Sequence, residues 1–401
     1  MSSTPNPPEQ PDGPETPDTP ERPDAPDRRE VPAGQDKPEQ PDTPSRPDAS
    51  RVSKDADDTH DVRDTHSRRD THAVREARGD GRRPHQGLKL LGVAVLVPIV
   101  IGIVLALFAW PVSQLAPRDL PIGVAGPAQV TDPLAQQLAG AGKNAFDVHR
   151  YPDEAAARAA IQDREVYGAV VAGRDGIALL VASAASPLVA QLLTQAVAGQ
   201  AQATGLQPQI ADVVPAPTAD PRGVVFGATL LPLVLAGLAI GILMALVSRP
   251  GLAQLLGLLV ASVLTGLVTI AIAQTWLEAL RCNWWVNAGV VSLTVLAIAV
   301  IVAGLGDLIG PVGLGLGVVL VLFVGNPFAG VTTAPELLPR WAGVTGQLLP
   351  PGAGGTLLRS TAFFDGAAAL RPVAVLCAWV AIGLAFVLLG TLLRRPGTNT
   401  H

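Results

Sequence analysis

The sequence predicts a membrane all-α bundle of six transmembrane helices with an inserted extracytoplasmic α/β domain and a disordered N-terminal tail. Three observations lead to this fold class. Six long apolar stretches follow residue 88, a block of mixed character separates the first stretch from the other five, and residues 1–87 hold almost no large apolar side chain. The chain therefore divides into a tail, one span, an inserted domain and a block of five spans.

The tail, residues 1–87, is dominated by proline and charged residues, as in PEQPDGPETPDTPERPDAPD. It holds 20 acidic and 14 basic side chains, a net charge of −6, whereas the whole chain carries −5. The rest of the chain is therefore close to neutral, and the acidic balance says little about a substrate. Such a composition cannot bury enough apolar surface to offset its chain entropy, so we expect a disordered cytoplasmic segment.

A short repeat in the tail, DTHDVR–DTHSRR–DTHAVR, places His60, His66 and His72 six residues apart. Evenly spaced histidines suggest a metal-binding or pH-sensing tract. However, a spacing of six does not place side chains on one face of a helix, and it is not a usual metal-ligand spacing. The sequence therefore favours a solvated repeat without a fixed geometry.

Six apolar stretches are long enough to cross a bilayer, since a spanning helix needs about 20 mostly apolar residues. They run over residues 88–110, 223–247, 252–273, 288–305, 309–331 and 372–393. Only one residue in these stretches carries a charged side chain, namely Lys89 at the edge of the first stretch. A helix of a soluble protein needs a polar face, so these stretches indicate an integral membrane protein. The first is too long and begins too late for a cleaved signal, and we expect it to remain as an anchor.

Basic residues near the span ends predict the orientation. Clusters lie before the first span, between the second and third, and after the last: Arg82, Arg83, Lys89, Arg249, Arg394 and Arg395. With six spans, all of these lie on one side of the membrane. We therefore expect a multi-pass protein of the plasma membrane with a cytoplasmic N-terminus and a cytoplasmic C-terminus, residues 396–401.

The block between the first two spans, residues 111–222, reads as a folded α/β domain. Strands are expected at 120–126, 145–151, 167–173 and 177–183, and helices at 131–141, 152–166 and 187–203. Thr131 or Asp132 is expected to cap the first helix. The order strand, helix, strand predicts that the first strands are parallel, and the turn Arg174–Gly176 predicts a hairpin. A proline-rich segment, 207–222, leads back into the membrane.

A second extracytoplasmic loop, 332–371, joins the last two spans of the 223–395 block. Its pieces are amphipathic, and its tryptophan and paired phenylalanines suit a helix or re-entrant segment at the membrane interface. The candidate interface or pathway residues are Trp341, Pro350, Pro351, Gly352, Phe363, Phe364 and Asp365.

Motifs for covalent chemistry are not found in the sequence. There is no G-x-x-x-x-G-K-[ST], and GAGG at 352–355 lacks the lysine that follows a phosphate-binding loop. His149 reads as a strand-edge side chain and Asp307 as a turn residue at the cytoplasmic surface. Cys282 and Cys377 are expected at different membrane depths, so a disulfide is not expected. We predict no catalytic, cofactor-binding or metal-ligating residue, no enzyme activity and no nucleic-acid partner.

Four segments resemble a known family: LPIGVAGPAQVTDPLAQQL, FDVHRYPDEAAARAAIQDREVYGAVV, LLVASAASPLVAQLL and LPPGAGGTLLRSTAFFDGAA. In these segments, and in its layout over residues 88–395, the chain resembles the phage-infection-protein-like (YhgE/Pip-like) membrane proteins, which are related to type-2 ABC export permeases. Its richness in Ala, Gly, Arg and Pro looks actinobacterial.

This resemblance implies a permease-like subunit that exports a lipid, drug or cell-envelope molecule. It also implies a separate ATPase subunit and a homodimer, or a heterodimer with a related permease, within the lipid bilayer. The expected cytoplasmic loops, near 248–250 and 306–308, offer little surface to an ATPase. A non-transporting envelope receptor, scaffold or secretion accessory protein therefore stays open as the alternative.

Overall fold

The computed structural model describes most of the chain after the tail, namely residues 84–140, 142, 144–173, 176–204 and 208–393. The expectations for the tail up to residue 83, for its histidine repeat and for the C-terminus beyond 393 lie outside these residues. The first helix is α1 (Pro84–Ser113).

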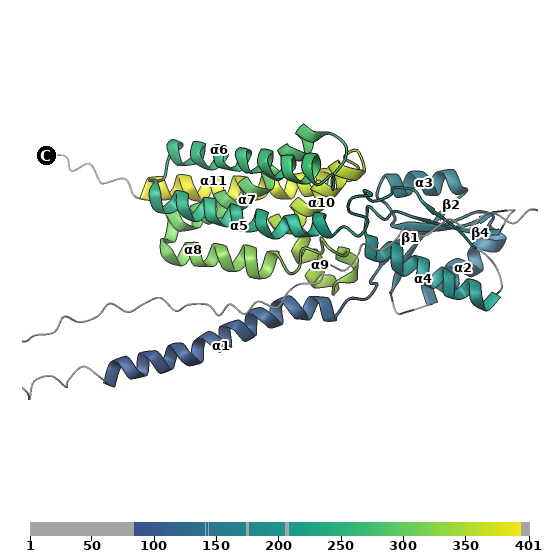
Figure 1. The fold of residues 1–401 in the computed structure, drawn as a ribbon, viewed down its shortest axis with the longest axis horizontal. Coiled ribbons are helices and arrows are strands. Elements are labelled where there is room, and N and C mark those ends of the chain that lie inside the picture. Colours follow the sequence, from purple (N-terminus) through teal and green to yellow (C-terminus); the bar gives the residue numbers. More distant parts are fainter. Residues whose placement is uncertain (1–83, 141, 143, 174–175, 205–207, 394–401) are drawn as a thin grey trace, which may run out of the picture. The chain divides into compact units, whose positions relative to one another are not determined.

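Five helices of the described chain are long and apolar enough to cross a membrane. They are α1, α5 (Val224–Val247), α6 (Leu252–Ile270) with its π-helical continuation η1 (Ala271–Trp276), α7 (Trp284–Ile309) and α11 (Leu370–Leu393) (Figure 1). Each corresponds to one of the predicted stretches. The chain is therefore a membrane-embedded helical protein.

The remaining predicted stretch, 309–331, forms a shorter apolar helix. It consists of α8 (Pro311–Val318) and the π-helical segment η2 (Val319–Gly325). A Cβ atom on Gly313 would lie within 2.4 Å of the Leu305 backbone, and one on Gly317 would lie 3.1 Å from Val302. Residue numbers rise along α8 as they fall along α7, so the two helices pack antiparallel.

Helix α7 is the centre of the membrane part and contacts α5, α6, α8, α10 and α11. Glycines allow the close approach: a Cβ on Gly237 of α5 would meet Ile298 at 2.7 Å, and one on Gly383 of α11 would meet Val300 at 2.6 Å. Small residues thus permit close packing of these helices. Gly241 against Ala299 and Gly390 against Asp307 show that α5 and α11 run parallel to α7.

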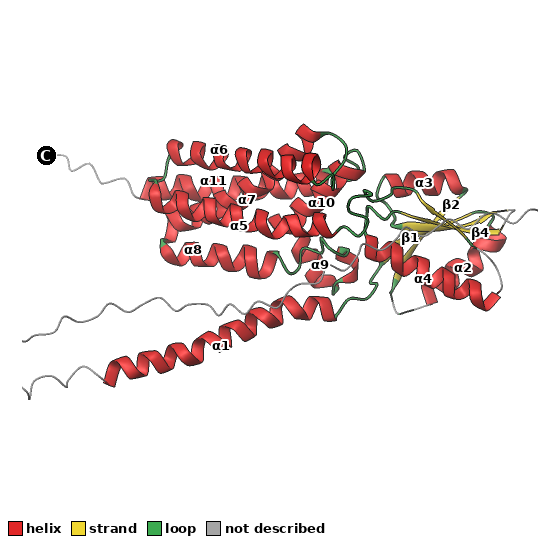
Figure 2. Ribbon diagram, in the orientation of Figure 1, coloured by secondary structure: helices red, strands yellow, loops and turns green. Residues whose placement is uncertain are grey.

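The α/β domain contains one five-stranded sheet with the strand order β2-β1-β3-β4-β5 (Figure 2). The strands are β1 (Leu120–Ala125), β2 (Phe146–Tyr151), β3 (Gly168–Gly173), β4 (Gly176–Val181) and β5 (Gln209–Asp212). The helices are α2 (Ala128–Gly140), α3 (Glu154–Gln162) and α4 (Pro187–Thr204). β1 is parallel to β2 and β3, and β3 and β4 are antiparallel, as the sequence predicted.

Two details of this domain differ from the sequence-based expectation. The short strand β5 lies in the segment expected to be only a proline-rich connection, where it pairs in parallel with β4. Helix α2 begins at Ala128 rather than after a Thr131 or Asp132 cap, because Pro127 starts the helical turn. Thr131 is instead buried inside the helix, and its hydroxyl donates to the Pro127 carbonyl at 3.2 Å.

Helices cover both faces of the sheet. Ala157, Ala160 and Ile161 of α3 share one core with β3 and β4 residues. Residues of α4, among them Val189 and Ala190, pack on the other face, where α2 contributes Leu138. Asp153 caps α3, accepting the Ala156 N–H at 2.9 Å, which fixes where that helix begins.

The loop 332–371 contains a helical hairpin. A single 3₁₀ turn, η3 (Pro335–Leu337), leads into α9 (Arg340–Gln347), and two residues later α10 (Pro350–Phe363) returns toward the domain. The sequence predicted a helix in this loop, and the structure has two, α9 and α10.

Candidate functional site: the re-entrant hairpin beneath the α/β domain

The hairpin α9–α10 reaches deep among the membrane helices. A Cβ on Gly354 would meet Thr294 at 2.3 Å, and Thr294 is ten residues inside α7. At 1.5 Å per residue this is about 15 Å, roughly half of a 30 Å hydrocarbon core. The Trp379 indole, within α11, donates to the Leu348 carbonyl at the hairpin turn at 2.8 Å. The turn therefore lies near the middle of the membrane helices.

Protein covers most of this turn, although the Leu348 side chain is 48% exposed. Pro350, Pro351 and Gly352 are buried at the start of α10. Irregular backbone is tolerated at membrane depth only where protein or a water-filled cavity covers it, because lipid offers no hydrogen bonds. Gln347 provides two such bonds: its amide donates to the Ala329 carbonyl at 2.8 Å and accepts from the Thr356 hydroxyl at 2.7 Å.

Two glycines make the hairpin possible by close backbone approach. A Cβ on Gly346 would lie 1.7 Å from the Phe328 carbonyl oxygen, and one on Gly352 would lie 2.2 Å from the Gly346 carbonyl oxygen. Neither neighbour is a flexible side chain, so a larger residue would push the backbones apart. This gives Gly352, a predicted candidate, a packing role.

The seven predicted residues do not form one site. Pro350, Pro351 and Gly352 lie at the deep end of α10, and Phe363, Phe364 and Asp365 lie at its other end, about 20 Å away along the helix. Trp341 lies on α9, 57% exposed, with its ring stacked on Trp110 of α1 at a centroid distance of 5.4 Å. The structure thus separates a deep group from a group in contact with the domain.

At the domain end, the two phenylalanines have different partners. Phe364 belongs to the core of the α/β domain, where it joins the cluster that contains Ile161 of α3. Phe363 packs against Phe226 of α5 at 5.8 Å between ring centroids. Asp365 is exposed and adopts a positive φ of 49°, which turns the chain after α10. The hairpin therefore contributes directly to the core of the domain.

Polar groups of the domain complete this contact. Arg164, which follows α3, donates to the Thr356 carbonyl at 3.1 Å and to the Ser360 hydroxyl, and its guanidinium lies over the Phe364 ring at 5.3 Å. The Tyr167 hydroxyl donates to Glu336 at 2.8 Å. Burial, and then the Glu336 charge, raise the pKa of Tyr167, and burial lowers the pKa of Arg164. We call these groups, Arg164, Tyr167, Glu336 and Ser360, the domain seat.

Arg359 lies beside the seat and is only 5% exposed. It donates to the Val331 carbonyl at 2.6 Å, and its guanidinium lies 4.6 Å from the centre of the Phe226 ring. Within the described residues its Nε has no hydrogen-bond partner. Sequence reasoning missed this residue and the seat, because a helix that carries a single arginine gives no motif. The one available signal was a basic residue inside an otherwise apolar helix.

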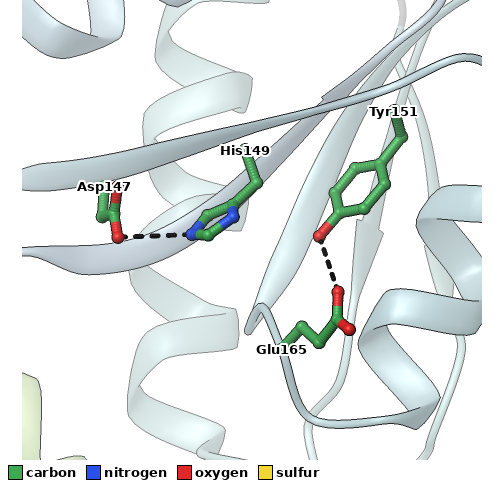
Figure 3. Close-up of polar contacts among 4 residues, drawn as sticks. All are labelled: Asp147, His149, Tyr151 and Glu165. Carbon is green, nitrogen blue, oxygen red and sulfur yellow. Dashed lines mark hydrogen bonds and ion pairs between the residues drawn. The ribbon is translucent and has the colours of Figure 1, made fainter.

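The edge strand β2 presents a second polar group (Figure 3). His149 and Asp147 point toward one another at 3.3 Å, and the Tyr151 hydroxyl lies 3.3 Å from Glu165. The His149 side chain is 42% exposed on this edge, as the sequence predicted. Burial, then Glu165, raise the pKa of Tyr151 to about 12. In the described part of the chain no group of three or more potential metal ligands comes together.

Asp307 corrects one sequence-based interpretation. Instead of a turn residue at the surface, it is a residue in the last turn of α7 that is 2% exposed. The Gln254 amide of α6 donates to it at 3.4 Å, and Gly390 of α11 lies against it. The small glycine and the neighbouring helix explain the burial. Nothing in the local sequence reveals it, because both lie far away in the chain.

The free cysteines and the comparisons complete the description. Cys282 and Cys377 are both free and exposed, so neither forms a disulfide within the described chain.

Comparison with protein-family models, with curated proteins and with solved structures finds no match to this chain.

Proposed function

We propose that this chain is a permease-like membrane subunit that moves a lipid, drug or cell-envelope molecule, with energy supplied by a separate ATPase subunit. The observation that carries this proposal is the re-entrant hairpin with its turn at Leu348, near the middle of the membrane helices. Discontinuous helices at this depth commonly line the pathways of transporters. The π-helical segments η1 and η2 add two further irregular stretches of a kind frequent at functional sites.

The chemistry of the membrane part favours an apolar or amphipathic cargo over an ion. A groove of about 520 Å³ lies between α5 and α6 near η1. Apolar side chains line it, together with Thr229, Thr265 and Thr269, and no charged residue does. Ion-coupled carriers use ionisable side chains within the membrane. An uncharged groove with a few hydroxyls instead suits an acyl chain or a similar molecule.

The proposal includes a six-crossing topology in the plasma membrane with both ends cytoplasmic. Helices α7 and α11 run in the same direction, so the chain between them must return across the bundle. In this proposal the antiparallel helix α8–η2 is that return. The basic clusters then lie on the side opposite the α/β domain, which makes the domain extracytoplasmic.

The proposal also includes kinship with the phage-infection-protein-like membrane proteins and with type-2 ABC export permeases. The support is the sequence segments that resemble this family and the layout of one span, an inserted domain and a spanning block. Pairing with a second copy or a related permease follows from this layout. The exposed surface of α1, none of whose membrane window is buried within the described chain, is apolar and available for such pairing or for lipid.

A non-transporting receptor, scaffold or secretion accessory is the second candidate. The short turns at the end of the helix bundle away from the α/β domain favour it. Only residues 248–251 join α5 to α6, and Gly310 alone joins α7 to α8. These two turns offer an ATPase very little surface within the described chain.

One experiment separates the two candidates. The full chain would be purified from membranes of its native host in lipid nanodiscs, and its particle mass and ATP hydrolysis would be measured. The permease proposal expects more than one permease copy per particle and ATP hydrolysis that accompanies an associated ATPase subunit. A monomer with no ATPase subunit and no ATP hydrolysis would contradict it and leave the receptor or scaffold as the better explanation.

A further inference from the structure

A polar pocket of about 200 Å³ lies between the segment that links α1 to β1 and the hairpin. It is far larger than the roughly 10–15 Å³ that one water requires. Its lining includes three arginines, Arg118, Arg340 and Arg371, and two acids, Asp119 and Glu336. The formal charge is thus +3 − 2 = +1.

The two carboxylates of the pocket already have partners. Arg340 forms an ion pair with Asp119, and Glu336 accepts the hydroxyl of Tyr167. Among the described residues, the Arg118 guanidinium is held by backbone oxygens: it donates to the carbonyls of Leu337 at 2.8 Å, Gln114 at 2.9 Å and Ala116 at 3.2 Å. These bonds fix the guanidinium but leave its charge uncompensated.

Arg371 is the second uncompensated charge. Within the described residues it has no ion pair, and it is exposed. Glu336 keeps its negative charge, because a tyrosine hydroxyl does not neutralise it, so two unpaired guanidinium groups stand against one carboxylate and the pocket is net positive. Such a pocket suits an oxyanion, because the planar fork of arginine binds phosphate oxygens in pairs. The chemistry of the pocket therefore points to a phosphate group.

The pocket lies at the border of the membrane. Arg371 is the second residue of α11, and Arg118 follows the end of α1 at Ser113 by five residues. Trp341, next to Arg340 on α9, stacks on Trp110, and tryptophans concentrate at membrane interfaces. Leu370, next to Arg371, is 85% exposed and gives an acyl chain an apolar surface. A phosphate at this border is most simply the headgroup of a membrane lipid.

We propose that the pocket formed by Arg118, Arg340 and Arg371 binds the phosphate headgroup of an anionic phospholipid from the outer leaflet. The lipid then contacts Arg118, in the segment that follows α1, and Arg371, at the start of α11. It thereby bridges the ends of these two helices next to the domain. This site holds whether or not the protein transports anything, and so it goes beyond the proposed function.

The test uses the full chain in nanodiscs that contain equal amounts of phosphatidylglycerol and phosphatidylcholine with identical acyl chains. Native mass spectrometry measures which lipid stays bound when the particle is released. We expect phosphatidylglycerol to be retained preferentially, and Arg371→Gln to lower that preference about fivefold, the effect of one arginine near a lipid surface. Arg371 makes no ion pair, so this variant should fold normally.

Arg222→Gln is the matched control, because Arg222 is exposed beside the start of α5 and does not line the pocket. It should keep the preference for phosphatidylglycerol. Equal retention of both lipids would refute the site, because the protein would then show no attraction for the anionic lipid. An equal fall of the phosphatidylglycerol preference in both variants would also refute it, because the attraction would then be spread over the surface. Release of the bound lipid by millimolar glycerol phosphate would also overturn the proposal, in favour of a soluble phosphate ligand.

Discussion

At the scale of single residues, the buried polar groups of the domain seat decide how the domain meets the hairpin. Arg164 and Tyr167 lie three residues apart, between the end of α3 and the start of β3. Their partners are far away in the chain: Glu336 is 169 residues from Tyr167, and Thr356 is 192 residues from Arg164. Such long-range bonds are satisfied only in the folded protein. A buried polar group that loses its partner costs about 1–3 kcal/mol, so these contacts hold the domain in one position.

Replacement of Tyr167 by phenylalanine tests the seat. The change removes the hydroxyl that donates to Glu336 but keeps the ring, so we expect the free energy of unfolding to fall by about 1–2 kcal/mol. Thermal unfolding in detergent measures the effect. Tyr151→Phe is the control, because the Tyr151 hydroxyl makes a longer and more exposed contact at 3.3 Å, and it should change stability by less than about 0.5 kcal/mol. Equal effects of both variants would remove the special role of the seat.

The two tyrosines also predict a pH dependence. Tyr151 and Tyr167 are the only tyrosines of the chain, and the pKa of each is raised in the folded protein. The unfolded chain would lose their protons near pH 10 and the folded chain only near pH 12 or above. Their contribution to stability is therefore complete below about pH 10 and decreases as the pH rises further.

Ultraviolet absorbance of tyrosinate measures this titration. In the folded protein we expect little tyrosinate at pH 10, and a rise in absorbance when the chain is unfolded at the same pH. Tyr151→Phe leaves only the Tyr167 signal, which should appear last. A titration midpoint near pH 10 in the folded protein would contradict the raised pKa of both tyrosines.

At the scale of elements, the re-entrant hairpin shows what sequence can and cannot reveal. Trp341 and the pair Phe363–Phe364 are apolar residues in a loop between spans, and the helix that they predict there is present. The depth of the hairpin depends on Gly346 and Gly352, whose neighbours come from elsewhere in the chain or from the facing helix. A single sequence does not identify those neighbours. The same limit explains why Arg359 and the seat were missed.

Gly346→Ala should destabilise the hairpin, because its new methyl group would lie 1.7 Å from a backbone carbonyl that has no room to move. Overpacking of this kind costs about 1–3 kcal/mol. Gly315→Ala on α8 is the control: nothing lies within 4 Å of its Cβ position, and alanine favours a helix over glycine. The control should therefore melt at the same temperature or slightly higher. If the two variants melted alike, close backbone contact would not limit the hairpin.

At the scale of the whole molecule, the direction of each helix determines the topology more firmly than hydropathy does. The stretch 309–331 passes as a span by composition, but its helix α8–η2 is shorter than the other five. This helix ends at Gly325, and the chain continues into the loop that carries the hairpin. Composition alone does not distinguish a full span from a shorter helix completed by a hairpin, since both are equally apolar.

The proposed six-crossing topology predicts on which side each end of α8–η2 lies. In a background with Cys377→Ser, an impermeant maleimide applied to intact cells should label the native Cys282 and an introduced Thr332→Cys, both exposed on the side of the domain. Ile309→Cys, at the far end of α7, should react only after the cells are permeabilised, because α7 runs away from the domain. Cys282 serves as the positive control for outer access. If Ile309→Cys and Thr332→Cys were labelled from the same side, α8–η2 would not cross the membrane, and the C-terminus would then lie on the side opposite to the N-terminus.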